Sequence, residues 1–193
     1  MSLTLLLIHG LPATGKTALA HWLAQQLQWP VFHKDDLKEI LFDTQGWSTR
    51  ERSRQLGAGV IEILYYAMAA QLNAGVSCIV ESNFNSELSS PRINEILLKT
   101  NARCIQVLCN TDEVLRRQRF QARVRHPGHA DAEPVANPNA APATLAEALA
   151  RLAVPGPVIE VDTTDLARVS YDEILSQIQT HLSTVDSSDR SKL

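Results

Sequence analysis

The sequence has no excess of basic charge. Its 18 lysine and arginine residues are outnumbered by 21 aspartate and glutamate residues, which gives a formal net charge of −3. A surface that binds nucleic acid broadly needs the opposite balance. We therefore do not expect nucleic acid as a partner, although a local basic patch stays open.

Cysteine is scarce as well, and long hydrophobic runs are absent. The three cysteines form no CxxC pair and lie in or beside apolar runs, so we expect buried, reduced thiols rather than disulfides. No apolar stretch approaches the ~18 residues of a membrane-spanning helix. The start, MSLTLLLIHG, lacks the basic region and cleavage site of a signal peptide.

These absences favour a cytoplasmic protein without a membrane partner. The final residues Ser191, Lys192 and Leu193 match a peroxisomal signal, which would act only in a eukaryotic cell. The oligomeric state is not indicated by the sequence.

Short apolar runs alternate with helix-length amphipathic segments, which is typical of an α/β fold with a parallel sheet. The first run is continuously apolar, as in a strand buried on both faces. Strands are predicted over residues 3–10, 29–36, 76–84, 102–110 and 156–164. Helices are predicted over 16–27, 48–75, 90–100, 111–125, 143–152 and 170–182, with caps at Ser48, Thr111 and Ser170.

This order of elements predicts three layers, with a five-stranded parallel sheet flanked by helices. We expect one domain over residues 1–185, followed by a flexible tail over 186–193. The proline-, alanine- and asparagine-rich stretch 126–142 is expected to be a mobile loop.

A G-x-x-x-x-G-K-[ST] pattern follows the first predicted strand, within IHGLPATGKTAL. Its glycines let successive backbone N–H groups turn towards phosphates, and the following helix adds the positive end of its dipole. Lys16 is expected to reach the β- and γ-phosphates, and the Thr17 hydroxyl to ligate Mg²⁺. The sequence therefore predicts a site for ATP and Mg²⁺ formed by Gly10, Leu11, Pro12, Ala13, Thr14, Gly15, Lys16, Thr17 and Ala18.

Two classes of nucleotide-binding protein are disfavoured. A GTPase would carry an NKxD-type motif that reads the base, and none is present. An AAA+ or helicase motor usually ends its acidic strand in an Asp–Glu pair and needs added elements. Here the third predicted strand ends in Glu81 alone and the chain is short. Of these classes of nucleotide-binding protein, the compact kinases are the one that the sequence favours.

Acidic and polar residues follow the second and third predicted strands, at the edge where open α/β sheets bind ligands. A carboxylate there can accept the proton of a hydroxyl that attacks the γ-phosphate. We predict Asp35 as this base, with Asp36 and Lys38 on the acceptor; the alternative is that the two aspartates only cap a helix. Glu81 is predicted to contact Mg²⁺ through water, and Asn83 to bind the acceptor or a phosphate.

The predicted helix 111–125 is strongly basic, and its positions 116, 119 and 123 are expected to share one face. Arginines that close over the site stabilise the charge of a phosphoryl group in transfer. We predict that arginines of this helix are catalytic, within a helical lid over about 112–142. A solvated basic face is the alternative.

These features resemble the P-loop kinases related to chloramphenicol phosphotransferase, zeta toxin and the kinase domain of polynucleotide kinase. The resemblance rests on GLPATGKT, KDDLK, VESNF and RRQRFQAR followed by RHPGH, and covers roughly residues 1–165. It implies a P-loop NTPase fold with a lid and adenine near the loop 162–165.

The resemblance also implies roles for single residues. Asp35 corresponds to the base, and Arg119 and Arg123 correspond to lid arginines that grip the nucleotide phosphates. Lys38 stands where arginine is commoner, and Glu81 where aspartate is commoner.

The leading hypothesis is an ATP-dependent kinase that phosphorylates a hydroxyl of a small molecule. A kinase of nucleotide or nucleic-acid ends is disfavoured by the net charge and by Lys38, since lysine binds phosphate only as a point charge. An ATP-binding switch that hydrolyses slowly is a third possibility. The acceptor is not indicated; candidates for its pocket on the long helix are Arg50, Arg54, Tyr65 and Tyr66.

Overall fold

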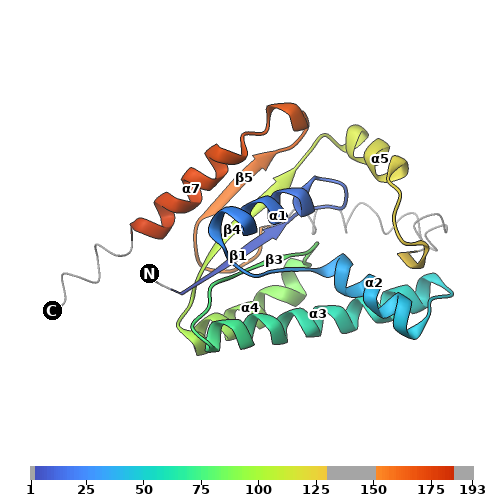
Figure 1. The fold of residues 1–193 in the computed structure, drawn as a ribbon, viewed down its shortest axis with the longest axis horizontal. Helices are drawn as coiled ribbons and strands as arrows, with labels where there is room; N and C mark the ends of the chain where they lie inside the picture. Colours follow the sequence, from blue (N-terminus) through green and yellow to red (C-terminus); the bar gives the residue numbers. More distant parts are fainter. Residues whose placement is uncertain (1–2, 130–150, 185–193) are drawn as a thin grey trace.

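Five parallel strands form the centre of the computed structural model, which describes residues 3–129 and 151–184 (Figure 1). The strands are β1 (Thr4–His9), β2 (Val31–His33), β3 (Cys78–Glu81), β4 (Arg103–Asn110) and β5 (Val158–Asp162). Their order across the sheet is β2-β3-β1-β4-β5, and all neighbouring pairs are parallel. The predicted α/β fold with a five-stranded parallel sheet is confirmed.

Helices cover both faces of the sheet (Figure 1). They are α1 (Lys16–Leu27), α2 (Lys34–Gln45), α3 (Arg50–Asn73), α4 (Ser86–Thr100), α5 (Glu113–Ala122) and α7 (Tyr171–Ser183). Leu5 and Leu7 of β1 belong to the core on the side of α3 and α4, whereas Leu6 and Ile8 belong to the core on the side of α1 and α7. Successive strand residues point to opposite faces, so a strand covered on both sides has to be apolar throughout, as predicted.

Three helix starts differ from their predicted positions. The cap of α3 is Thr49, whose hydroxyl accepts from the Arg52 N–H at 3.1 Å, and the cap of α5 is Asp112. α4 begins at Ser86, four residues before the predicted start, with Asn85 as its cap. Ser170 caps α7 as predicted. Each true cap has an extended backbone that lets its side chain reach an N–H three residues on.

The basic helix is shorter than predicted, because α5 ends at Ala122 and Arg123 is already extended. A short 3₁₀ turn, η1 (Pro127–His129), follows. The rest of the predicted lid beyond residue 129, most of the predicted helix 143–152 and the tail 186–193 lie outside the described residues. Within the described part, no helix is long and apolar enough to cross a membrane.

Candidate active site

The loop between β1 and α1 has a backbone suited to holding phosphates. Gly10 and Gly15 have φ values of 136° and 78°, a region that disfavours other residues. A Cβ on Gly10 would lie only 2.2 Å from the carbonyl oxygen of Cys109 in β4. Since α1 begins directly after the loop, its first N–H groups add to those of the loop.

Lys16, Thr17 and Glu81 meet beside this loop. Lys16 Nζ donates to the Leu11 carbonyl at 2.7 Å and lies 3.7 Å from Glu81 Oε1. The Thr17 hydroxyl donates to Glu81 Oε2 at 3.3 Å. Burial lowers the pKa of Lys16, and the charge of Glu81 partly opposes this. A hydroxyl beside a carboxylate offers the oxygen ligands that Mg²⁺ prefers, so these residues fit the predicted ion.

A third partner of Glu81 is His33, the last residue of β2. The two residues lie opposite each other in neighbouring strands, and His33 Nδ1 is 3.3 Å from Glu81 Oε2. His33 is buried. No role was predicted for it, although only Lys34 separates it from the two aspartates.

The candidate base, Asp35, lies in the first turn of α2 and accepts a hydrogen bond from Arg125 Nη2 at 2.6 Å. Arg125 Nη2 is also 2.8 Å from Nε2 of His129, which in turn lies 2.8 Å from Glu39 Oε1. Burial by itself raises the Asp35 pKa, but Arg125 and the other nearby cations outweigh it and lower the pKa below its usual value. Asp35 is therefore ionised near neutral pH, as a general base must be.

Two predicted acceptor-binding residues lie at the same edge of the sheet. Lys38 Nζ donates to Ser53 Oγ of α3 at 2.9 Å and lies 5.2 Å from the centre of the Phe42 ring. Asn83 Oδ1 accepts from Lys34 Nζ at 2.7 Å. These contacts fix both predicted side chains beside the base.

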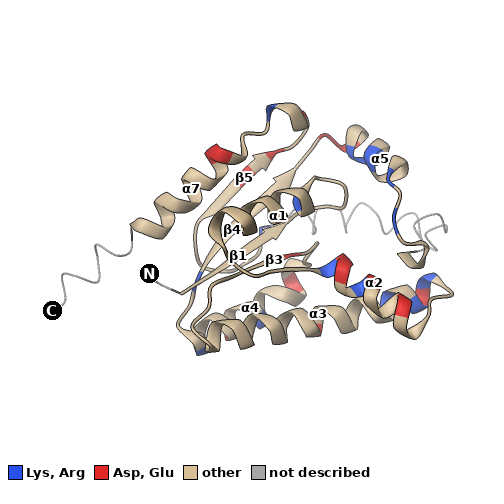
Figure 2. Cartoon of the chain, in the orientation of Figure 1, with Lys and Arg blue, Asp and Glu red and all other residues tan. Residues whose placement is uncertain are grey.

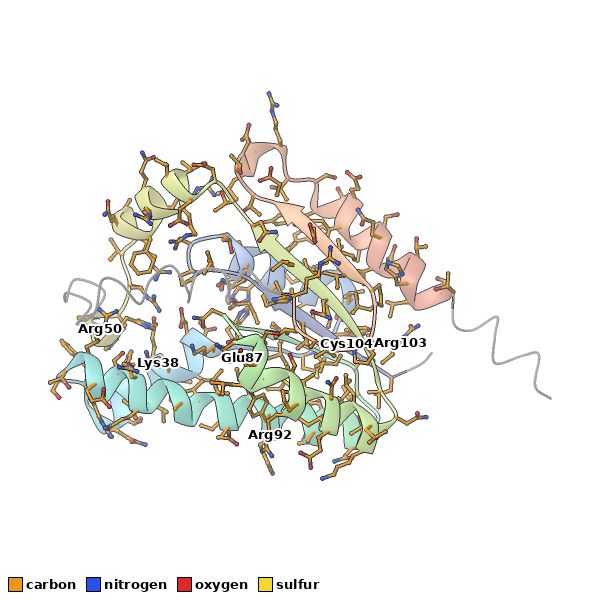
Figure 3. The ribbon with its side chains drawn as sticks, turned by 180° about the vertical axis from the view of Figure 1, so that it is seen from behind. Lys38, Arg50, Glu87, Arg92, Arg103 and Cys104 are labelled. Carbon is orange, nitrogen blue, oxygen red and sulfur yellow. The ribbon has the colours of Figure 1, made fainter. Side chains whose placement is uncertain are left out.

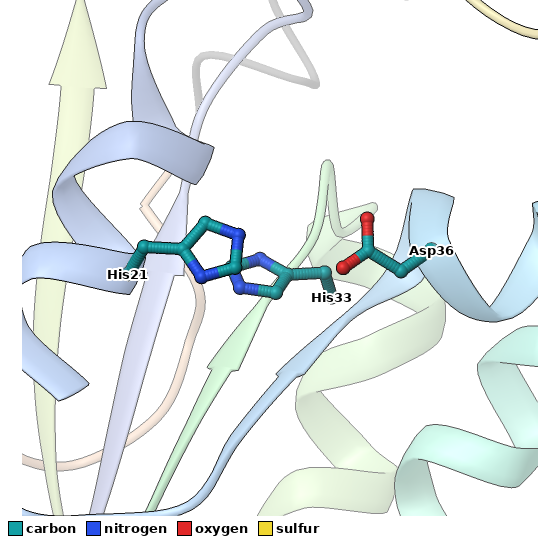
Figure 4. A group of neighbouring side chains, drawn as sticks. All are labelled: His21, His33 and Asp36. Atoms are coloured by element: carbon teal, nitrogen blue, oxygen red, sulfur yellow. The ribbon is translucent and has the colours of Figure 1, made fainter. Parts of the chain in front are cut away.

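Asp36 lies elsewhere. It is not among the residues that line the space beside Asp35, whereas Lys34, the other neighbour of Asp35 in α2, is. Its carboxylate instead lies near His21 and His33 (Figure 4), and one potential ligand atom from each of the three lies within 4.8 Å of the others. The structure therefore does not support the prediction that Asp36 binds the acceptor.

One cleft of about 360 Å³ joins the phosphate loop to the candidate base. Lys16 and Thr17 line it from the loop, Asp35 from α2 and Glu81 from β3. The other lining residues are Pro12, Ala13, Gly15, Ala18, Lys34, Lys38, Arg50, Ser82, Asn83, Phe120, Arg123, Arg125 and His129. A nucleotide phosphate chain and an acceptor thus have a common space in which to meet.

The two predicted lid arginines occupy different places. Arg123 lines the cleft, with its guanidinium 4.2 Å from the Phe120 ring centre. Arg119 is not among the lining residues and donates to the carbonyls of Thr163 and Thr164, both at 2.8 Å. Because α5 ends before residue 123, position 123 does not share a helix face with positions 116 and 119, and that prediction is wrong. Arg119 instead lies at the loop where the resemblance places adenine.

Comparison with known proteins supports this picture. A family model described as an AAA domain matches residues 5–154. A presumed kinase from Chloroflexus aurantiacus J-10-fl, known from its crystal structure, is 34% identical, with 94% of this chain and 99% of that chain covered and a TM-score of 0.83. The chain belongs to this family of P-loop kinases.

Two more distant kinases share the fold. A sugar kinase from Janibacter sp. HTCC2649 is 16% identical, with 94% of this chain and 95% of that chain covered and a TM-score of 0.57. The APS kinase of Mycobacterium tuberculosis, solved in complex with AMPPNP and APS, is 14% identical, with 95% and 99% covered and a TM-score of 0.60. At these identities the likeness concerns the fold alone. None of the curated proteins matches the chain.

Membership in a P-loop kinase family implies the use of a nucleotide such as ATP, and the loop over residues 10–17 has the backbone for it. The particular contacts of residues 10–18 with ATP stay a prediction. The role of Asp35 as the base and the role of Arg123 as a lid arginine also stay predictions.

The four acceptor candidates on α3 lie in different surroundings. Arg50 lines the cleft of this P-loop kinase. Arg54 lies on the surface, 3.8 Å from Glu51, and Tyr66 is 76% exposed. Tyr65 is buried in the core, with Arg92 over its ring. Only Arg50 of the four is therefore placed to meet an acceptor.

Proposed function

We propose that this kinase transfers the γ-phosphoryl group of Mg²⁺-ATP to a hydroxyl group of a small molecule. The observation that carries the proposal is that Asp35 opens into the same cleft as Lys16 and Thr17. A protein that only binds ATP and signals through that binding has no need of an ionised base at this position.

Five residues of the cleft have roles in this reaction. Asp35 accepts the proton of the attacking hydroxyl, while Lys16 and Arg123 stabilise the negative charge that spreads over the transferring group. Thr17 would hold Mg²⁺ directly and Glu81 through a water molecule. When bound, Mg²⁺ would partly neutralise the negative charge of the nucleotide phosphates.

A metabolite extract incubated with the protein and Mg²⁺-ATP tests the proposal. Mass spectrometry identifies compounds that gain one phosphoryl group. We expect a product that disappears with Lys16→Ala and with Asp35→Asn, the latter because a general base typically contributes 10²–10⁴-fold. Asp172→Asn is the matched control, since this exposed carboxylate lies in the first turn of α7 and does not line the cleft.

The outcomes separate the alternatives. ADP without any phosphorylated product would overturn the kinase proposal in favour of a slow ATP-hydrolysing switch. Phosphorylation of oligonucleotide ends, added in a parallel incubation, would replace the small-molecule acceptor by a nucleic-acid end. An unchanged rate of phosphoryl transfer in Asp35→Asn would show that Asp35 is not the base.

A further inference from the structure

Three side chains outside the cleft bring metal-binding atoms together. His21 comes from α1, His33 from the end of β2 and Asp36 from the first turn of α2. Figure 4 shows the two imidazole rings facing each other with the carboxylate on the other side of His33. One ligand atom from each lies within 4.8 Å of the others, and no other such group of three occurs in the described residues.

The environment of His33 prepares it as a ligand. Its Nδ1 is 3.3 Å from the Glu81 carboxylate, while its Nε2 is buried and has no hydrogen-bond partner. An ionised carboxylate can only accept, so the hydrogen-bond network assigns the proton to Nδ1 and leaves a lone pair on Nε2. A histidine held by a carboxylate in this way is the usual arrangement behind a metal-ligating imidazole. A buried nitrogen without a partner is costly, and a metal ion would satisfy it.

His21 and Asp36 are the two members of the group whose side chains can move. Both are exposed, so their side chains are free to turn. The rings of His21 and His33 lie 4.1 Å apart at 37°. Ligands about 2.1 Å from a shared tetrahedral ion are roughly 3.4 Å from one another. Rotation of the two exposed side chains about their own bonds is therefore the movement that closes the site.

We propose that His21, His33 and Asp36 bind a transition-metal ion of the Zn²⁺ type, at a site distinct from the Mg²⁺ position beside Thr17. Two imidazoles and one carboxylate suit Zn²⁺, with water in the fourth position, and do not suit Mg²⁺, which prefers oxygen. The ion joins α1, which follows the phosphate loop, to α2, which carries Asp35. The proposal depends on neither the acceptor nor the kinase activity.

Calorimetry with Zn²⁺ and absorption spectroscopy with Co²⁺ on the untagged full chain test this site. We expect one ion per chain, not displaced by a large excess of Mg²⁺. His21→Gln should weaken binding at least ~10-fold, as expected from the loss of a ligand or its support, and so should Asp36→Asn. His181→Gln, on α7, should leave binding unchanged. His21 is exposed, so its replacement does not disturb the fold.

Two results would overturn the proposal. One is the absence of saturable Zn²⁺ binding by the unaltered protein. The other is binding that His21→Gln leaves as tight as before, which would show adventitious binding to other surface side chains, such as His126 beside Asp43.

Discussion

At the scale of single residues, opposing effects act on the carboxyl group of Asp35. Burial disfavours its charged form, whereas Arg125, 2.6 Å away, favours it and contributes to a lowered pKa. Arg125 is itself in contact with His129, whose side chain is only 4% exposed and which reaches Glu39. The ionisation of the candidate base thus depends on residues that follow the end of α5.

Replacing Arg125 with glutamine should raise the Asp35 pKa, because burial then meets less opposition. In the proposed reaction, the acid limb of the kcat/KM profile should move to higher pH. At a pH near 5 the variant should retain a smaller share of its plateau rate than the unaltered enzyme does. The pH dependence of phosphoryl transfer measures both effects.

Arg117→Gln is the matched control, since Arg117 is exposed and pairs with Glu113 rather than with the base. Its acid limb should coincide with that of the unaltered enzyme. An acid limb that Arg125→Gln does not move would separate Arg125 from the ionisation of Asp35.

The site residues differ in how far the sequence predicts them. The phosphate loop is a local pattern of eight residues, and Asp35 follows a strand end within the same short stretch, so both can be found by spacing. The partnership of Asp35 with Arg125 joins residues 90 positions apart and depends on where α5 ends. The family resemblance favoured Arg119 and Arg123 instead.

At the scale of elements, the start of α3 is a further place where structure and sequence pattern diverge. Ser48 and Thr49 are adjacent and both are good cap residues. The pattern Ser48–Glu51 predicted the first as the cap, but the hydroxyl of Thr49 is the one that accepts from an N–H of the helix. The helix matters for the site because it begins with Arg50 and contains Ser53, the partner of Lys38.

We expect Thr49→Ala to lower the free energy of unfolding by about 1 kcal/mol, the typical cost of a lost cap. In a chain of this size that corresponds to a drop in Tm of about 2–4 °C. Ser48→Ala should change stability by less than about 0.5 kcal/mol, as for most surface positions. Thermal unfolding of the two variants side by side is the measurement. A larger loss of stability in Ser48→Ala than in Thr49→Ala would mean that Ser48 is the cap.

Element types were predicted more reliably than their ends. The strands other than β2 are marked by their apolar runs, and α1 is bounded by the glycine of the phosphate loop, so these follow from local sequence. The predicted strand 29–36 was too long, because β2 ends at His33 and α2, for which no helix was predicted, begins at Lys34. The end of α5 carries no glycine, and the nearest proline is Pro127, four residues beyond Arg123. Nothing local therefore marks the point at which the chain leaves the helix.

At the scale of the whole molecule, a net charge of −3 conceals a local concentration of charge. Figure 2 shows basic and acidic segments gathered on α2, α5 and the start of α3, around the carboxyl edge of the sheet. Figure 3 shows Lys38 and Arg50 at this end of the molecule, and Arg92 and Arg103 far from it. Composition alone cannot reveal this arrangement, because it arises only when strands distant in sequence become neighbours.

Stability in acid should depend on His9, which is buried at the end of β1 beneath the phosphate loop. Burial, reinforced by the charge of Lys16, lowers the His9 pKa from 6.5 to about 4. Between these values the unfolded chain binds a proton at His9 that the folded chain does not. The free energy of unfolding should therefore fall as the pH drops from about 6.5 to about 4, by about 3 kcal/mol from this residue.

His9→Gln should lose correspondingly less stability between pH 7 and pH 4.5 in denaturant-induced unfolding. Both proteins retain His129, whose pKa is also lowered, so the difference between their pH dependences isolates His9. Equal losses in the two proteins would mean that His9 takes up no proton on unfolding.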